Sequence, residues 1–571
     1  MTQTSTKTID DVGAAHISTT GESAPPSDLE RIDTVDIENY HGLSAKIIVV
    51  YLSICLIGLS QLMTLVGAGA FARDVAGPLN GISDSVWFAQ TIAIVTVALG
   101  PPISQAADLW GRKWFLVVLT ACGFVGSMIV ARASSMKMAI AGHAITGVAF
   151  SVQPLLYAVT SEILPRRYRP AAQGGLNAAL GMGGILALTA GSAMVKDYGF
   201  RSFYYLIASL LAVSSITCAL LYNPPQRPLQ KSLVTSHKLQ RLDWVTYFML
   251  IVGVVLFVMA LSWAENPYSW KSAQVLAPLL IGSTFIVALL IHQIVIKKDG
   301  LFHHDLFGRN AFRSNRNFSL ALLVIFIDGM AFFAATNYYP FEMSILFDSD
   351  PVKIGLRFSL VFFAAIAASL LVAIYSSITK DVRLPVISSF AAFVAFFGCM
   401  SSLTTGSSTA AWIYPVILGL GLGMSLTCLV TLAQLSTPPH LIAVASGLII
   451  SIRSLGASVG LAIYTSIFNT KIAENLGKDI AAAVIPLGLA PESLQQFIVA
   501  LVSHNNQALI AVQGATPQII GAGVHALQNS YLRAFRDVWI AAAVFSAVAT
   551  IVACLFVRPS TITMHVDAPL E

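Results

Sequence analysis

The chain has 571 residues, of which 56% are hydrophobic and only 11% are charged, and its mean hydropathy is +0.75. A typical soluble domain carries roughly 25% charged residues, so these values exclude a water-soluble globular protein and indicate an integral membrane protein. The formal charge of +5 is small and its basic residues are spread between apolar segments, which indicates no nucleic-acid partner.

The first 45 residues differ in composition from the rest of the chain. They carry eight acidic residues among Ser, Thr and Pro, a composition typical of disorder. We therefore expect residues 1–45 to form a disordered cytosolic tail. The first apolar stretch begins too far along the chain for the usual cleavable signal peptide.

Long apolar runs then recur from Ala45 to Val557. A membrane-spanning helix needs about 20 apolar residues at a rise of 1.5 Å each, which predicts about fourteen spans. They centre on 47–70, 86–104, 115–131, 138–160, 173–195, 203–222, 244–264, 274–296, 318–341, 354–378, 384–403, 411–433, 441–468 and 538–557.

The charge distribution over the connecting segments predicts the orientation. With a cytosolic N-terminus, the inner loops would hold about twice as many basic residues as the outer loops, as the positive-inside rule requires. An even number of spans then places both termini in the cytosol. The inner set is Arg112, Lys113, Arg166, Arg167, Arg169, Arg227, Lys231, Lys238, Arg241, Lys297, Lys298, Arg309, Arg313, Arg316, Lys380 and Arg383.

A faint internal repeat divides the spans into two halves. Gly147 precedes Pro165 by the same interval that Gly421 precedes Pro439, and parallel repeats are a common way to build a transporter around a midplane site. The repeat predicts an N-terminal six-helix bundle (46–222), a cytosolic loop (223–242), an inserted helix pair (243–296), a second loop (297–317), a C-terminal six-helix bundle (318–557) and a cytosolic tail (558–571). Residues 469–536 would form a long outer loop that is apolar enough to contain interfacial helices.

The loop after the second span carries a recognisable signature. Residues 104–113 read SQAADLWGRK, in which Asp108, Gly111, Arg112 and Lys113 match G-x-L-A-D-x-x-G-R-[KR] and Ser104 replaces the leading glycine. This pattern resembles the conformational-lock loop of the major facilitator superfamily. Its acid can face the positive end of a helix while its arginine pairs with an acid, which would hold the cytosolic face in one state.

Two further segments narrow the resemblance. Residues 161–169 (SEILPRRYR) match E-x-x-P-x-x-x-R, and residues 198–205 (YGFRSFYY) are similar to the W-R-x-x-F-Y entry of the sixth span. With fourteen spans and a long last outer loop, residues 45 to 558 resemble the fungal fourteen-helix drug:proton antiporters, most closely the trichothecene-efflux-pump-like branch. The resemblance implies an all-α integral membrane protein with the major facilitator fold.

The sequence departs from that pattern in two places. The fifth span lacks the proline of the antiporter motif G-x-x-x-G-P-x-x-G-G, and its register is Gly183, Ala187, Leu188, Gly191, Ser192. In the fourth span, a histidine stands in Gly142-His143-Ala144-Ile145-Thr146-Gly147 where the family usually keeps arginine.

Ionisable residues within spans are costly and are therefore candidates for function. Asp328 could bind and release a proton, or form a structural hydrogen bond. His143 could relay a proton because histidine titrates near neutral pH, or pack as a neutral ring. Arg453 needs an acid, a carbonyl or an anionic substrate as partner. These three residues are the predicted proton-coupling sites.

Other polar residues along the spans are candidates for lining a substrate cavity. Any of them could instead bond to a neighbouring helix, and for Glu342 a vestibule role and an interfacial anchor are both open. The set is Gln153, Tyr157, Asn177, Asn337, Glu342 and Gln434.

No cofactor or metal site is predicted. Adjacent His303 and His304 do not point at one ion, the six cysteines lie singly in apolar runs, and neither a nucleotide-binding loop nor a catalytic constellation is present. We therefore expect a transporter, not an enzyme, driven by an ion gradient instead of ATP.

The predicted function is proton-coupled export of small organic toxins, drugs or secondary metabolites. The alternative is proton-coupled import of a metal chelate such as a siderophore, which the thinned fifth-span motif and Arg453 favour. A non-transporting receptor or a membrane enzyme is a third class. We expect a monomer in the plasma membrane, with the vacuolar membrane as the alternative location.

Overall fold

The structure is a computed structural model that describes residues 45–163, 169–224, 238–239, 242–264, 268–293, 316–347, 350–379, 381–404, 406, 408–435, 442–502, 509 and 512–556. Several predictions lie outside these residues. They concern the leader, most of both cytosolic loops, the C-terminal tail, the two adjacent histidines, and the side chains of Asp108 and Gln434.

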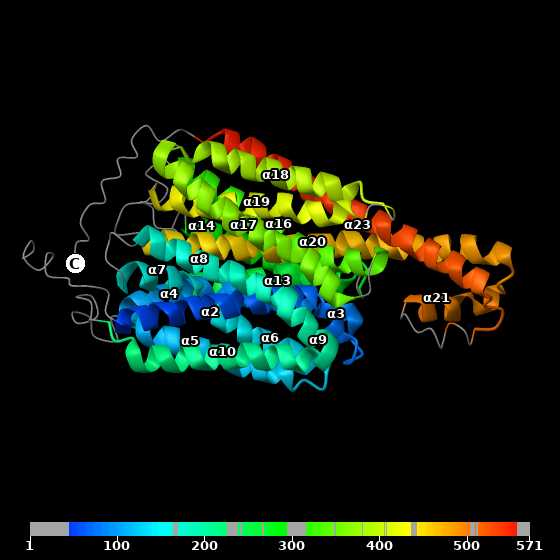
Figure 1. Ribbon diagram of the computed structural model, residues 1–571, viewed down its shortest axis with the longest axis horizontal. Helices are drawn as coiled ribbons and strands as arrows, with labels where there is room; N and C mark the ends of the chain where they lie inside the picture. Colours follow the sequence, from blue (N-terminus) through cyan, green and yellow to red (C-terminus); the bar gives the residue numbers. More distant parts are fainter. Residues whose placement is uncertain are drawn as a thin grey trace, which may run out of the picture. The chain divides into compact units, whose positions relative to one another are not determined.

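The elements of the described chain are helices (Figure 1). Fourteen candidate spans among the described residues are long and apolar enough to cross a membrane, in agreement with the sequence prediction. In chain order the helices are α2 (Ala45–Ala70), α3 (Ala72–Ala76), η1 (Ile82–Asp84), α4 (Trp87–Trp110), α5 (Arg112–Ala131), α6 (Met136–Phe150), α7 (Gln153–Ile163), α8 (Arg169–Leu186), η3 (Ala187–Gly191), α9 (Ser192–Tyr198), α10 (Phe200–Leu221), α13 (Trp244–Trp263), α14 (Ala273–Ile291), α16 (Arg316–Leu346), α17 (Pro351–Thr379), α18 (Arg383–Ser401), α19 (Ala410–Leu435), α20 (Ile442–Val484), η6 (Ile485–Leu487), η7 (Pro491–Ser493), α21 (Leu494–Val502) and α23 (Pro517–Cys554).

Local signals explain several helix ends. Ser135 precedes α6 and its side chain accepts a hydrogen bond from the backbone N–H of Met138 at 3.3 Å, which satisfies one of the free donors of the first turn. Thr516 does the same for α23, where Pro517 follows at the first helical position. Gly111 separates α4 from α5 with φ of 99°, a conformation that only glycine adopts readily.

The helices from Val49 onward pack into one compact unit. In the N-terminal half, α5 packs against α6 and α10, and α4 against α6; in the C-terminal half, α16 packs against α19, α20 and α23, and α17 against α19. The halves meet along two seams, where α4 lies against α20 and where α8, η3 and α9 lie against α17. The inserted hairpin packs through α13 onto both α4 and α20, so it covers the first seam.

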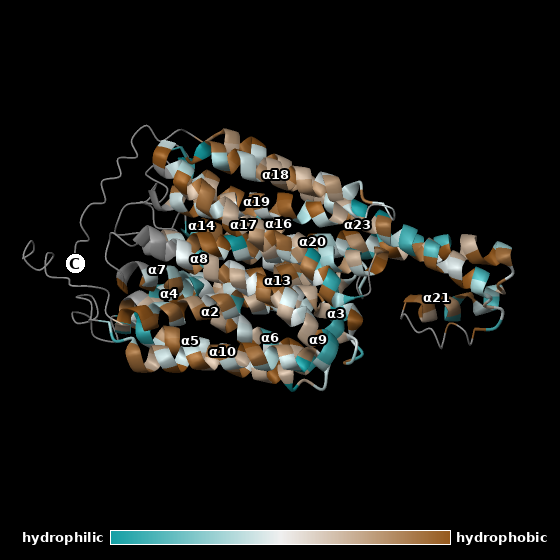
Figure 2. Ribbon diagram, in the orientation of Figure 1, coloured by the Kyte–Doolittle hydropathy of each residue, from teal (hydrophilic) through white to brown (hydrophobic). Residues whose placement is uncertain are grey.

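Residues 469–536 differ from the predicted loop. The thirteenth helix continues to Val484, and the fourteenth begins at Pro517, so much of the segment is a pair of packed helices. Asp479 of α20 joins them, because it accepts hydrogen bonds from Ser530 at 2.7 Å and Arg533 at 3.4 Å on α23. Hydrophobicity marks only the part of a helix that lies in lipid, and the continuation of these helices carries more hydrophilic residues (Figure 2). The continuation of α20 ends where proline and glycine occur, at Pro486 and Gly488.

Glycines let the backbones of α16 and α20 approach closely in the C-terminal half. A Cβ atom added to Gly456 would lie 1.9 Å from the carbonyl oxygen of Phe326, and one added to Gly329 would lie 2.0 Å from that of Arg453. Such distances are impossible for real side chains, so glycine is required at both positions. Small residues that let helices approach in this way are typical of membrane-protein interfaces.

We predict that Gly456→Ala destabilises the protein because the added methyl group must push α16 and α20 apart. Overpacking of this kind costs about 1–3 kcal/mol, and the midpoint of thermal unfolding in detergent should fall. Gly477→Ala is the matched control on the same helix, because a Cβ there meets nothing within 4 Å. Equal midpoints for the two variants would contradict the prediction.

Candidate functional site

A small cavity lies between the two halves. Its volume is about 40 Å³, which holds roughly three water molecules at about 10–15 Å³ each. The N-terminal half and the C-terminal half both contribute to its wall. The lining residues are Gln61, Leu62 and Leu65 of α2, Ile92, Ala93 and Thr96 of α4, Phe150 of α6, Gln153 of α7, Leu180 of α8, Gly329, Phe332 and Phe333 of α16, and Arg453, Ser454 and Ala457 of α20.

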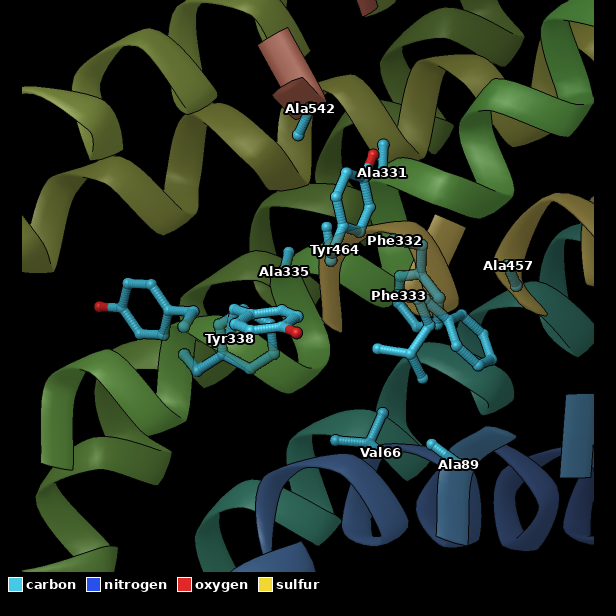
Figure 3. Packing of buried hydrophobic residues seen from close by; sticks show 14 of the residues in the cluster. Val66, Ala89, Ala331, Phe332, Phe333, Ala335, Tyr338, Ala457, Tyr464 and Ala542 are labelled. Carbon is cyan, nitrogen blue, oxygen red and sulfur yellow. The ribbon is translucent and has the colours of Figure 1, made fainter. Parts of the chain in front are cut away.

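Most of this wall is apolar. Figure 3 shows Phe332 and Phe333 of α16 between α20, marked by Ala457, and the first two spans, marked by Val66 and Ala89. An organic solute larger than a few waters can enter only when these helices separate.

An ion pair stands at the C-terminal wall of the cavity. Asp328 of α16 is fully buried, and its Oδ2 accepts a hydrogen bond from Nε of Arg453 on α20 at 2.6 Å. The other carboxylate oxygen, Oδ1, accepts from the hydroxyl of Ser425 on α19 at 2.5 Å. Three helices of the C-terminal half therefore meet at one carboxylate.

The geometry explains how Arg453 is tolerated within a span. Its side chain is 19% exposed, its guanidinium carbon lies 5.2 Å from the ring centroid of Phe332, and its charge is balanced by Asp328. A paired, hydrogen-bonded charge facing a cavity costs far less than an isolated one in hydrocarbon. The structure thus brings together two of the three predicted coupling residues.

His143, the third predicted coupling residue, lies apart from this pair. Its ring is fully buried and stacks on Phe88 of α4 with centroids 4.7 Å apart. Nδ1 lies 2.8 Å from the carbonyl oxygen of Ala139, and Nε2 lies 3.0 Å from the hydroxyl of Tyr204 on α10. Because a carbonyl can only accept, Nδ1 carries a hydrogen, and in the neutral ring Nε2 then accepts from the tyrosine. The contacts of both ring nitrogens and the stacked phenylalanine are those of a packed histidine.

The predicted cavity residues that the structure describes differ in their surroundings. Gln153 lines the cavity, whereas the hydroxyl of Tyr157 donates to Oδ1 of Asn177 at 2.9 Å and joins α7 to α8. Asn337 donates to the carbonyl of Phe333 in its own helix. Glu342 is not among the residues that line the cavity and lies buried against α23, where it accepts a hydrogen bond from the Trp539 indole at 2.7 Å.

The predicted lock loop forms the tight junction of α4 and α5. Arg112 is the first residue of α5 and is buried, and Lys113 donates to Oδ1 of Asn223 at 2.5 Å. In the preceding turn of α4, Gln105 accepts a hydrogen bond from the hydroxyl of Tyr247 on α13. The inserted hairpin is therefore bonded directly to the helix that carries the loop.

Sequence reasoning missed several polar residues of the site, including Thr96 and Ser454, which line the cavity. Gln61 of α2 lines the cavity; its amide donates to the carbonyl of Ala149 at 2.9 Å, and its Oε1 is buried without a hydrogen-bond partner. A lone amide in the middle of an apolar span was the available signal. Ser425 gave no such signal, because serine is common in spans and often bonds its own helix.

We predict that Asp328→Ala lowers the free energy of unfolding by about 3 kcal/mol, because it leaves Arg453 without its counter-charge. Adding Arg453→Leu to that variant should recover part of the loss, since the unpaired cation is then removed. Asp537→Ala provides a control, because its ion pair with Lys471 spans 3.8 Å and is about 40% exposed on both sides, and exposed pairs contribute about 0–1 kcal/mol. Strictly additive effects in the double variant, measured by unfolding in detergent, would contradict the coupling.

Comparisons with known proteins agree with this architecture. The chain is 23% identical to the efflux pump FUS6 of Gibberella moniliformis, over 86% of this chain and 83% of that protein, and 25% identical to the MFS-type efflux transporter ffsH of Aspergillus flavipes, over 84% and 81%. A bacterial homologue of the lysosomal transporter Spinster, in an inward-facing and occupied conformation, shares the fold with a TM-score of 0.56 and 16% identity, over 90% of this chain and 97% of that chain. The sequence profile of the fungal trichothecene efflux pump (TRI12) family matches residues 73–570. The chain belongs to this family of major facilitator transporters.

Proposed function

We propose that this protein exports small, largely apolar organic compounds in exchange for protons, and that Asp328 and Arg453 couple the two fluxes. The observation that carries the proposal is the buried ion pair at the wall of a cavity shared by both halves. The relatives FUS6 and ffsH are an efflux pump and an efflux transporter, which supports export.

The pair provides a physical route to proton coupling. While Arg453 and Ser425 hold the carboxylate of Asp328, its charge is compensated and the acid stays ionised. When the helices move and Arg453 leaves, the buried carboxylate loses its cation, and binding a proton removes the cost of the isolated charge. The return of Arg453 expels that proton. The close glycine contacts between α16 and α20 confine this exchange to a short movement.

The cavity also limits the chemistry of the substrate. Apolar side chains form most of the wall, and the polar groups are few: Gln61, Thr96, Gln153, Ser454 and Arg453. Because Asp328 balances the charge of Arg453, the wall does not offer a free cation to an anionic ligand. This favours a neutral organic solute with a hydrogen-bond donor over an anionic metal chelate, although Arg453 alone had favoured the chelate.

The remaining features of the proposal concern the whole protein. Residues 46–222 and 318–557 act as the two moving halves, with 243–296 as the inserted pair, and Asp108, Gly111, Arg112 and Lys113 hold one end closed. The protein works as a monomer in the plasma membrane with both termini in the cytosol. The positive-inside distribution of basic residues supports this orientation.

We predict that wild-type protein in proteoliposomes exports apolar toxins only when a pH gradient is imposed. Asp328→Asn should abolish gradient-driven export because an amide cannot exchange a proton, while substrate exchange without a gradient should continue. Glu474→Gln, an exposed acid on the continuation of α20, is the control and should leave both activities unchanged. Gradient-driven accumulation of a metal chelate in the direction opposite to export would instead establish the importer function.

Substrate recognition can be tested at Gln61. Its unpartnered amide oxygen should accept a hydrogen bond from the solute, so Gln61→Leu should weaken binding of a hydroxylated substrate by roughly five- to tenfold, the equivalent of about 1 kcal/mol. The deoxy analogue of the same compound should be affected much less. Equal effects on both compounds, measured as apparent KM, would show that Gln61 supports only the packing of α2 on α6.

A further inference from the structure

Glu342 is a second buried carboxyl of α16, separate from the coupling pair. It lies 14 residues after Asp328, about 21 Å along the helix at 1.5 Å per residue, and is only 1% exposed. Its Oε2 accepts a hydrogen bond from Nε1 of Trp539 on α23 at 2.7 Å, whereas its Oε1 is buried without a hydrogen-bond partner.

The surroundings of this carboxyl are aromatic. The ring of Trp539 stacks on Phe397 of α18 with centroids 5.8 Å apart and meets Phe396 and Tyr338 edge-on. The indole itself is fully buried, so its N–H requires an acceptor. Glu342 supplies it, but one neutral donor is a weak substitute for the several hydrogen bonds that water gives a carboxylate.

The charged and titratable groups that the structure describes on the neighbouring elements do not bond to Glu342. On α23, Arg533 pairs with Asp479, Asp537 pairs with Lys471 and Arg536 is exposed, and on α20 the hydroxyl of Tyr464 is buried without a hydrogen-bond partner. On α16, the hydroxyls of Tyr338 and Tyr339 donate to Thr465 and to the carbonyl of Ala411. Arg357 of α17 donates to Ser408 and contacts the sulfur of Met343, and Arg73 of α3 lies over Phe341. The aromatic residues of α18 carry no charge. Among the residues that the structure describes, neither a cation nor a second donor contacts this carboxyl. Ionisation of Glu342 would therefore be strongly unfavourable, so the carboxyl holds a proton in this conformation.

Glu342 lies next to a contact between the two halves. The guanidinium carbon of Arg73, in the N-terminal half, is 3.2 Å from the ring centroid of Phe341, the residue before Glu342. A Cβ on Gly69 of α2 would lie 3.3 Å from the carbonyl oxygen of Thr336. Near this contact, Lys196 of α9 pairs with Asp350 at 3.2 Å, just before α17. These contacts close the halves together at the end of the bundle that carries α3 and α9 (Figure 1).

The charge on this contact is stable at neutral pH. Burial lowers the pKa of the Arg73 guanidinium to about 10, so it remains a cation while it faces Phe341.

A proline interrupts α16 close to Glu342. Pro340 has no N–H to give to the carbonyl of Thr336. The helical hydrogen bonding of α16 is thus interrupted one turn before Glu342, which gives this segment freedom to shift when the halves separate.

We propose that Glu342 is a proton-binding site that must be occupied for the two halves to close at this end. When the halves separate, water reaches the carboxyl and the O–H bond at Oε1 breaks, with the proton passing to water. Closure requires the reverse step, in which a proton from the adjoining aqueous phase forms that bond again. The inference rests on the proposed antiport. In that cycle, the exporter has released its substrate, and a proton from the external phase then binds to Glu342 and allows this end to close.

The sign of the pH dependence follows from proton linkage. The closed state binds one proton more than the open state, so closure is favoured as the pH falls and is lost as it rises. A water-exposed glutamate titrates near pH 4.3. Above that value the ratio of closed to open protein should fall by up to about tenfold for each pH unit.

The test measures the distance between spin labels at Tyr198→Cys and Lys353→Cys, exposed positions beside the Lys196 and Asp350 pair, in protein without its six native cysteines. Between pH 5 and pH 8, the closed fraction of the wild-type protein should fall. Glu342→Gln keeps an acceptor for Trp539 and needs no proton, so it should remain closed throughout. A pH response in Glu342→Gln equal to that of the wild type would overturn the inference.

Two further variants separate this inference from a structural role and from the proposed function. If Glu342 serves only to accept the hydrogen bond of the Trp539 indole, Glu342→Gln should not change the distance between the labels in a protein that already carries Trp539→Phe. The inference requires that Glu342→Gln still keeps the labels close at high pH in that background. Asp328→Asn should retain the pH response of the labels while losing gradient-driven export. Retained gradient-driven export in Asp328→Asn, with the pH response of the labels unchanged, would therefore contradict only the proposed coupling, whereas normal antiport by the wild-type protein with no pH response of the labels would contradict only the role of Glu342.

Discussion

The backbone contact between α16 and α20 determines much of the chemistry of the C-terminal half. Two glycines, Gly329 and Gly456, let each helix reach the carbonyl oxygens of the other. At that separation Arg453 reaches Asp328 directly, at a heavy-atom distance of 2.6 Å. A wider spacing would leave a carboxylate and a guanidinium apart in a medium where neither can be hydrated, and neither residue could then be kept in its span.

The two buried carboxyls of α16 illustrate opposite solutions to the same constraint. Asp328 is matched with a cation and a hydroxyl from two other helices, so its charge is retained inside the protein. Glu342 has only an indole N–H, so it is retained in its neutral form. Asp328 is bonded to Arg453, which lines the cavity, and Glu342 follows Phe341 in the contact between the halves. The two acids thus separate substrate-linked proton exchange from closure along a single helix.

Much of the fold was predictable from the sequence because it depends on physical limits that a single sequence displays. The number of spans follows from the thickness of the bilayer, and the family follows from residues such as Gly111 and Arg112 at a fixed spacing; the helices and the family match confirm both. The length of α20 was not predictable from hydropathy, because residues such as Lys471 and Glu474 continue the helix in water, where no apolar run marks it.

The arrangement of the candidate site was less accessible. The sequence indicated that Arg453 needed a partner, but that partner lies 125 residues away, and no periodicity relates the two. In α16, most residues around the helix are buried, so no polar stripe shows which side faces the cavity. This is why Glu342 was grouped with the cavity residues although it faces α23. His143 was open to a packing role, and its two hydrogen bonds and the stacked Phe88 favour that interpretation.

The continuation of α20 and α23 past the apolar segments has a mechanical consequence. Because Asp479 ties the two helices together, the pair should move as a rigid rod attached to the C-terminal half. From Phe468 to Val484 this rod extends about 24 Å at 1.5 Å per residue. A rotation of the half by about 10° would therefore displace the far end by about 4 Å. A movement that is small at the cavity would be magnified outside the lipid, where an antibody or a bound protein could sense it or oppose it.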